Sequence, residues 1–178
     1  MSMSVRDRDY YLRLRREHEP ADIKLMIVAE SPPASGKYFY DPTGSPKEWL
    51  FAAIMLQLGI SPVTKEIGLR ELKQRGWVLV DATYVPVDKL AKDAGHDRDD
   101  VIVRDYPLLC EDLASLTPDR SSTPIVLIKS NVCRILGPLL TRDGFQVLNN
   151  GNAIYFPSHG NQTKFKSQFA AVVSGLPK

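Results

Sequence analysis

Residues 23–33 read IKLMIVAESPP, and this stretch determines the fold class. Its first part, Ile23–Ala29, is apolar except for Lys24, which is the pattern of a strand buried on both faces. Three further short apolar runs follow along the chain, at Trp77–Val80, Pro124–Ile128 and Phe145–Leu148. Because helical patterns separate these runs, the sequence predicts a single α/β domain over residues 1–178. We expect a three-layer α/β/α sandwich around a central, mostly parallel four-stranded sheet.

The expected helices carry apolar residues at helical spacing. They span Val5–His18, residues 46–59, Thr64–Arg75, Val101–Leu116, Asn131–Leu140 and Thr163–Val173. Pro46 is expected at the first position of its helix and Gly76 at the end of the next one. Pro107 is expected to kink or interrupt the helix around it. The first helix forms an N-terminal extension over residues 1–20.

The segment after the fourth strand has two interpretations. Ala153–Phe156 either extends that strand or forms a hairpin arm beside it. Asn150 and Gly151, which precede it, favour a turn with positive φ.

The composition is that of an ordinary globular protein, with 178 residues, 43% hydrophobic and 25% charged. A chain of this length buries about 70% of its unfolded surface, so it needs neither a metal nor a disulfide to stabilise its core. Cys110 and Cys133 are too few for a four-thiolate cluster and predict buried thiols in a reducing compartment. The net charge of +2 permits a polyanionic partner without requiring one.

No targeting or membrane-spanning segment is expected. The first residues are rich in arginine and aspartate and lack an apolar core. The longest apolar stretch, Trp49–Ile60, is interrupted by Gln57 and Gly59 and is shorter than the roughly 20 residues that span a bilayer. The sequence therefore predicts a cytoplasmic protein without a membrane partner.

The residues that follow each strand are the candidates for chemistry, because ligands of parallel sheets bind beyond the carboxyl ends of the strands. Glu30 follows the first strand and Asp81 the second, and residues 156–162 (FPSHGNQ) precede the last helix. The alternative is structural: Glu30 as a solvated or helix-capping residue, and Ser158 or Asn161 as a helix cap beside an exposed His159.

Several familiar sites are excluded. The chain contains no phosphate-binding glycine loop, no dinucleotide-binding glycine pattern and no nucleophile elbow. Its three histidines have no partner at metal-ligand spacing, and we expect His18 and His96 to be solvated. What remains is a site built from carboxylates, a histidine, amides and aromatic rings, with no metal and no cofactor.

Four short motifs in chain order resemble those of the uracil-DNA glycosylase superfamily, over most of the chain after Ile23. Residues 29–33 (AESPP) stand where the superfamily has G-E-A-P-G or G-Q-D-P-Y, and residues 36–39 (GKYF) match G-x-x-F. Residues 78–82 (VLVDA) correspond to a strand that ends in L-L-N-A, and residues 156–158 (FPS) match the x-P-S form of the closing motif.

The resemblance implies a monofunctional DNA glycosylase of base excision repair. Such an enzyme flips a deaminated base, uracil or hypoxanthine, out of DNA, hydrolyses its N-glycosidic bond and leaves an abasic site, without lyase activity. Glu30 would stabilise the sugar cation and orient or deprotonate the attacking water. Phe39 would stack on the base, and His159 would donate to uracil O2 or contact a phosphate. Ser31 and Pro32 would belong to the substrate-binding loop.

The resemblance also implies a DNA partner, double- or single-stranded, and we expect the protein to act as a monomer. The residues expected to enter the minor groove or to contact phosphates are Ser158, Gly160, Asn161, Gln162 and Lys164. Further lysines expected at phosphates are Lys37, Lys129 and Lys166.

Two departures from the superfamily pattern leave alternatives open. Asp81 replaces the base-reading asparagine, and an ionised carboxylate only accepts hydrogen bonds, although a buried and protonated one also donates. Phe156 stands where other branches have histidine. The alternatives are a non-catalytic DNA-binding module of the same fold and an N-glycosidase acting on nucleosides or nucleotides. Glu30 and Phe39 favour the enzyme over the first, and the loop before the last helix argues against the second.

Overall fold

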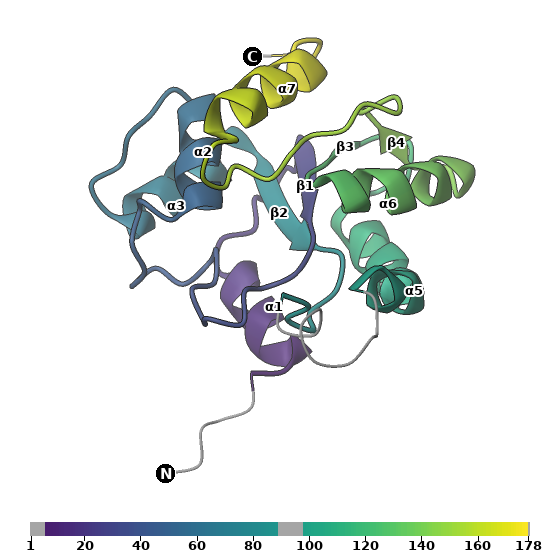
Figure 1. The fold of residues 1–178 in the computed structure, drawn as a ribbon, viewed down its shortest axis with the longest axis horizontal. Helices are drawn as coiled ribbons and strands as arrows, with labels where there is room; N and C mark the ends of the chain where they lie inside the picture. The colour runs from purple at the N-terminus through teal and green to yellow at the C-terminus, as the bar shows by residue number, and fades with distance from the viewer. Residues whose placement is uncertain (1–5, 89–97, 178) are drawn as a thin grey trace.

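A computed structural model describes residues 6–88 and 98–177 of the chain (Figure 1). Its sheet has the strand order β2-β1-β3-β4, and every neighbouring pair is parallel. The strands are β1 (Leu25–Ala29), β2 (Trp77–Asp81), β3 (Pro124–Leu127) and β4 (Gln146–Val147). The predicted α/β class with a parallel four-stranded sheet is thereby confirmed.

Helices cover both faces of this sheet. They are α1 (Arg8–Arg16), α2 (Trp49–Gln57), α3 (Lys65–Arg75), α5 (Arg98–Leu116), α6 (Ser130–Arg142) and α7 (Gln162–Val173). Helices α2, α3 and α7 lie on one side and α5 and α6 on the other (Figure 1). Alternate strand residues serve the two sides: Ile27 belongs to the first core, and Met26 and Val28 belong to the second. This arrangement is the predicted three-layer sandwich.

Two of the expected helix boundaries are confirmed in detail. Thr64 caps α3 through a hydrogen bond from Ile67 N–H to its side-chain oxygen, and Gly76 ends the helix at a φ of 81°. Pro107 lies inside α5, which continues through it to Leu116.

The prediction for Pro46 is wrong, because α2 begins at Trp49. Pro46 lies in a turn in which Ser45 accepts hydrogen bonds from Lys47 N–H at its hydroxyl and from Glu48 N–H at its carbonyl. The backbone of Glu48 is non-helical, with φ −55° and ψ 134°. Since the serine turn satisfies these donors, the helix starts only after it.

The predicted strand at Ala153–Phe156 is also wrong, since this segment has no strand structure. Its backbone groups find partners elsewhere: Ile154 O accepts from Lys129 N–H at 2.7 Å, and Tyr155 N–H donates to the Gln168 side chain at 2.9 Å. The turn before it is as expected, with positive φ at Asn150 and Gly151.

Both thiols are free and half-buried rather than fully buried as predicted. The sulfur of Cys133 donates to Leu127 O at 3.2 Å, and burial raises its pKa. Within residues 6–88 and 98–177, no helix combines the length and the apolar character needed to span a bilayer.

Helix α1 is joined to the rest of the fold by a buried ion pair. The Arg15 guanidinium donates to both carboxylate oxygens of Asp112 on α5, each at 2.7 Å, and to the Tyr84 hydroxyl at 2.8 Å. Tyr11 packs edge-on against Tyr38, with ring centroids 4.8 Å apart. Figure 1 places α1 beyond the carboxyl end of β2, where ligands of parallel sheets bind.

Candidate functional site

A cavity of about 570 Å³ opens at the carboxyl ends of β1 and β2. This volume lies within the range of small-molecule sites and accommodates a nucleobase. The four residues predicted to bind substrate all line it: Ser31, Pro32, Phe39 and Asp81. Its other aromatic walls are Tyr38, Trp49, Phe51 and Phe156. Residues far apart in the sequence thus converge on one hollow.

The loop that carries Phe39 is held by two buried polar side chains. Lys65 of α3, which is fully buried, donates to Tyr38 O and to a Glu48 carboxylate oxygen, each at 2.6 Å. The Tyr40 hydroxyl donates to Leu79 O and accepts from Leu79 N–H on β2. These bonds fix the aromatic wall of the cavity against the sheet.

Phe39 lines the cavity and also packs against neighbouring aromatic rings. Its ring centroid lies 5.3 Å from that of Phe51 and 5.1 Å from that of Tyr40. The side chain is buried, so a planar ligand in the cavity would meet a ring that is already immobilised. Core packing and base stacking are compatible roles here.

Asp81 ends β2 with a carboxyl group that has lost its water. The residue is 4% exposed, and its Oδ2 has no hydrogen-bond partner among residues 6–88 and 98–177. Burial raises the pKa of Asp81 to about 8; Arg15 opposes this rise, and the charges of Asp112 and Glu30 add to it. At neutral pH the group is therefore mostly a neutral acid that can both donate and accept.

Tyr38 brings a second unpartnered polar atom to the same cavity. The residue is 2% exposed, and its hydroxyl has no hydrogen-bond partner. Burial raises the pKa of Tyr38 well above its ordinary value, and the Asp81 charge raises it further. The hydroxyl consequently keeps its proton at any physiological pH.

Glu30 follows β1 and lies beside this cavity rather than in its lining. Its Oε1 accepts from Lys129 Nζ at 2.5 Å and is 3.4 Å from the Arg98 guanidinium. Its Oε2 accepts from the Asn131 amide at 2.6 Å. A carboxylate oxygen accepts about two hydrogen bonds, so Oε2 retains capacity for a water molecule.

The backbone at Lys129 is strained, because this residue has a φ of 82° without being glycine. Its N–H donates to Ile154 O, and its side chain turns toward Glu30. Residues held in such sparsely populated regions cluster at functional sites. The strain thus coincides with the contact that compensates the charge of Glu30.

Strand pairing brings the two carboxyl groups together. Asp81 pairs with Ala29, the residue before Glu30, and Thr83 N–H donates to Glu30 O at 3.1 Å. Glu30 has three donors and Asp81 Oδ2 has none. Two acids on neighbouring strands therefore occupy opposite electrostatic environments, as acid–base pairs in enzymes do.

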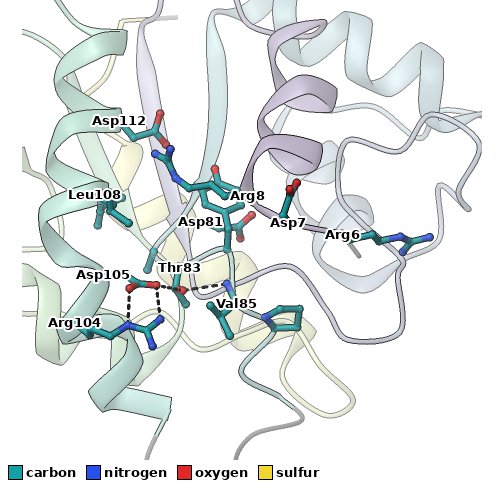
Figure 2. Close-up of a pocket in the computed structure, with 14 residues that line it drawn as sticks. Arg6, Asp7, Arg8, Asp81, Thr83, Val85, Arg104, Asp105, Leu108 and Asp112 are labelled. Carbon is teal, nitrogen blue, oxygen red and sulfur yellow. Dashed lines mark hydrogen bonds and ion pairs between the residues drawn. The ribbon is translucent and has the colours of Figure 1, made fainter. Parts of the chain in front are cut away.

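Asp81 also borders a second cavity, of about 470 Å³, between the start of α1 and α5. Figure 2 shows Asp81 beside Arg8, above the hydrogen-bonded chain of Arg104, Asp105 and Thr83. Asp105 accepts from Arg104 at 2.8 Å and from the Thr83 hydroxyl at 2.6 Å. Helix α1 thus supplies one wall of the region around Asp81.

The loop before α7 is separate from the cavity, except for Phe156. His159 and Gly160 are exposed and do not line either cavity described above, while Ser158 and Asn161 are half-buried. Asn161 precedes α7 without a side-chain cap bond. The remaining residues predicted to contact DNA, Gln162 and Lys164, are exposed at the start of α7.

Of the other two histidines, His18 lines neither cavity. His18 was expected to be solvated, but it is only partly so, since its ring stacks on Tyr40 with 6.0 Å between the ring centroids. His96 lies outside the described residues. In the described part of the chain, no group of three histidine, cysteine or acidic residues is arranged to hold a metal ion.

Sequence reasoning missed how Glu30 is surrounded. Lys129 was expected at a phosphate, whereas it is paired with Glu30, and Asn131 was not considered. The rule that placed Glu30 and Asp81 would have found both, because Lys129 and Asn131 follow the third strand. No signal marked Arg98, which reaches Glu30 from the start of α5.

The edge of the sheet thus combines an aromatic cavity, a buried acid at Asp81 and a charge-compensated carboxylate at Glu30. No protein-family model, curated protein or solved structure matches the chain.

Proposed function

We propose that the protein is a DNA glycosylase that hydrolyses the N-glycosidic bond of deaminated bases such as uracil and hypoxanthine. The observation that carries this proposal is the cavity of about 570 Å³, in which Phe39, Phe156 and Asp81 meet next to Glu30. A hollow with several aromatic walls and a few polar side chains, Asp81 among them, suits a planar heterocycle. The site needs no cofactor and no metal.

The base occupies the cavity after it has rotated out of the helix, a step that costs a few kcal/mol and less at a mispair. Phe39 offers a fixed aromatic surface for it. The neutral carboxyl group of Asp81 donates to a carbonyl of the base and accepts from the adjacent ring N–H. The donated bond strengthens as negative charge develops on the departing base, so it lowers the barrier.

Glu30 acts on the sugar side. Hydrolysis passes through a cation-like sugar, which a nearby carboxylate stabilises. Lys129 and Asn131 orient this carboxylate, and the free capacity of Oε2 holds the attacking water. The reaction consumes one water molecule and breaks the bond between base and sugar. It releases the free base and leaves an abasic site in the DNA. No covalent bond to the protein is formed, so no lyase step follows.

The DNA strand lies across the exposed loop before α7. Ser158, Gly160 and Asn161 enter the groove, and Gln162 and Lys164 contact the backbone. Since His159 is exposed and outside the cavity, we assign it to a phosphate rather than to the base. In this proposal the protein works as a monomer on cellular DNA.

The test is cleavage of end-labelled oligonucleotides that carry uracil, hypoxanthine or no lesion, single- and double-stranded, with alkali to reveal abasic sites. The wild type is expected to produce breaks at the lesion, and Glu30→Gln to abolish them while DNA affinity stays within about twofold. Glu66→Gln, an exposed change on α3, is the matched control. Binding of DNA without any abasic site would establish the non-catalytic module instead.

A further inference from the structure

Two residues that line the same cavity, Tyr38 and Asp81, are 2% and 4% exposed. The hydroxyl of Tyr38 and Oδ2 of Asp81 are both buried and have no hydrogen-bond partner among the described residues. Leaving a buried polar group unpaired costs about 1–3 kcal/mol, so such groups are uncommon in folded proteins. Two of them at one hollow indicate a ligand that brings the missing partners.

The chemistry of these two groups defines the ligand. The Tyr38 hydroxyl is a donor, and the neutral carboxyl group of Asp81 offers one acceptor and one donor side by side. Together they can present a row of donor, acceptor and donor. The complementary row, acceptor, donor and acceptor, is the imide edge of a base, in which a ring N–H lies between two carbonyl groups.

We propose that Tyr38 and Asp81 together select bases with an imide edge, of the uracil or xanthine type, with Tyr38 reading the second carbonyl. This inference rests on the proposed function for its ligand class, a nucleobase. Hypoxanthine has one carbonyl beside its N–H, so it satisfies Asp81 and leaves Tyr38 unpaired. Cytosine carries an amino group in place of one carbonyl, so one of the two donors faces another donor.

A contribution to the stability of the fold does not explain why residue 38 carries a hydroxyl group. Within the described structure it makes no hydrogen bond that Tyr38→Phe would break. The comparison residue is Tyr106 of α5, which is less deeply buried than Tyr38 and whose hydroxyl donates to Asp143 at 2.8 Å. Tyr106→Phe loses a bond and Tyr38→Phe loses none, so the two changes separate a structural hydroxyl from a functional one.

The experiment measures binding of free bases to the intact protein by the fluorescence of Trp49, which lines the cavity and is 51% exposed. Uracil, xanthine, hypoxanthine and cytosine are titrated into the wild type, Tyr38→Phe and Tyr106→Phe. The wild type is expected to bind the two imides most tightly. Tyr38→Phe is expected to weaken imide binding roughly 2- to 10-fold, the effect of one hydrogen bond, and to leave hypoxanthine unchanged.

Thermal unfolding of the same variants completes the comparison. Tyr38→Phe should melt at or above the temperature of the wild type, whereas Tyr106→Phe should melt lower and keep the imide preference. Equal loss of uracil and hypoxanthine binding in Tyr38→Phe, unchanged imide binding in that variant, or no binding of any base by the wild type would overturn the inference.

The cleavage assay decides the proposed function separately. A protein that binds uracil with the expected preference and cuts no oligonucleotide retains the imide site and loses the glycosylase assignment. If the protein cuts DNA but Tyr38→Phe and the wild type show the same preference between uracil and hypoxanthine, the glycosylase activity stands and the proposed role of Tyr38 is wrong.

Discussion

The ammonium group of Lys129 lies 2.5 Å from Oε1 of Glu30, although 99 residues separate the two along the chain. The contact joins the residue after β1 to the residue before α6 at the carboxyl edge of the sheet. It is made by a residue in a backbone conformation that lysine rarely adopts.

The strain at Lys129 can be measured by comparing two variants. Lys129→Ala and Lys129→Gly both remove the ion pair with Glu30, but only glycine adopts a φ of 82° without cost. We expect the free energy of unfolding of Lys129→Gly, measured in urea, to be about 1–2 kcal/mol larger than that of Lys129→Ala. At ordinary helix or strand positions the order is the opposite, so a less stable glycine variant would contradict the strain.

The buried acid at Asp81 makes stability depend on pH. Burial raises the pKa of Asp81 to about 8 in the folded protein, against 3.8 for an exposed aspartate, so the folded state binds more protons between these values. The stabilising contribution of the protonated acid is complete below pH ~4 and is lost as the pH rises to ~8, at up to about 1.4 kcal/mol per pH unit. Asp81→Asn should flatten this slope in urea unfolding at several pH values; parallel curves for both proteins would contradict it.

The selection of the base should depend on the protonation state of Asp81 as well. Above pH ~8 the ionised Asp81 only accepts hydrogen bonds and repels a carbonyl, so excision of uracil is expected to fall about tenfold for each further pH unit. Asp81→Asn keeps a donor and an acceptor at all pH values. We expect it to remove the alkaline decline and to narrow activity toward uracil, measured as excision rates of uracil and hypoxanthine from pH 6 to 10. An alkaline decline that persists in Asp81→Asn would assign the titration to another group.

Lys65 is predicted to hold the cavity wall. Lys65→Met leaves Glu48 and the Tyr38 carbonyl without their donor, and breaking a buried pair costs about 3–5 kcal/mol. The fluorescence of Trp49, one residue from Glu48, should change with it. Lys73→Met, an exposed change on the same helix, is the control and should cost less than about 1 kcal/mol in urea unfolding. Equal stability of the two variants would show that the Lys65 contacts are dispensable.

The layers of the fold were predictable because apolar runs and helical spacing are local signals. The caps at Thr64 and Gly76 are short-range as well, since each acts within its own turn. The helix start predicted at Pro46 was wrong because proline at the start of a helix and proline in a turn share the same φ. The hydrogen bonds to Ser45 distinguish the two cases. The strand prediction for Ala153–Phe156 failed because only Ile154 is buried, and Tyr155 N–H donates to the Gln168 side chain rather than to a strand.

The positions of Glu30 and Asp81 at the sheet edge followed from strand ends alone. Their environments did not, because Glu30 meets Lys129 and Arg98 only through the packing of α5 and α6 against the sheet. The sequence likewise could not distinguish Phe156 from His159 within one loop. Only the chain path places the first at the cavity and the second on the surface.

The joint between α1 and α5 has a consequence for the order of folding. Arg15 is synthesised early, yet its carboxylate partner Asp112 follows 97 residues later. Contacts of such long sequence separation form late, since the loop between them must first be closed. The sheet strands β1 and β2 are both complete before that point in the chain. The wall that the start of α1 forms beside Asp81 is therefore expected to be completed only after the strands that carry the two acids, when α1 is seated against α5.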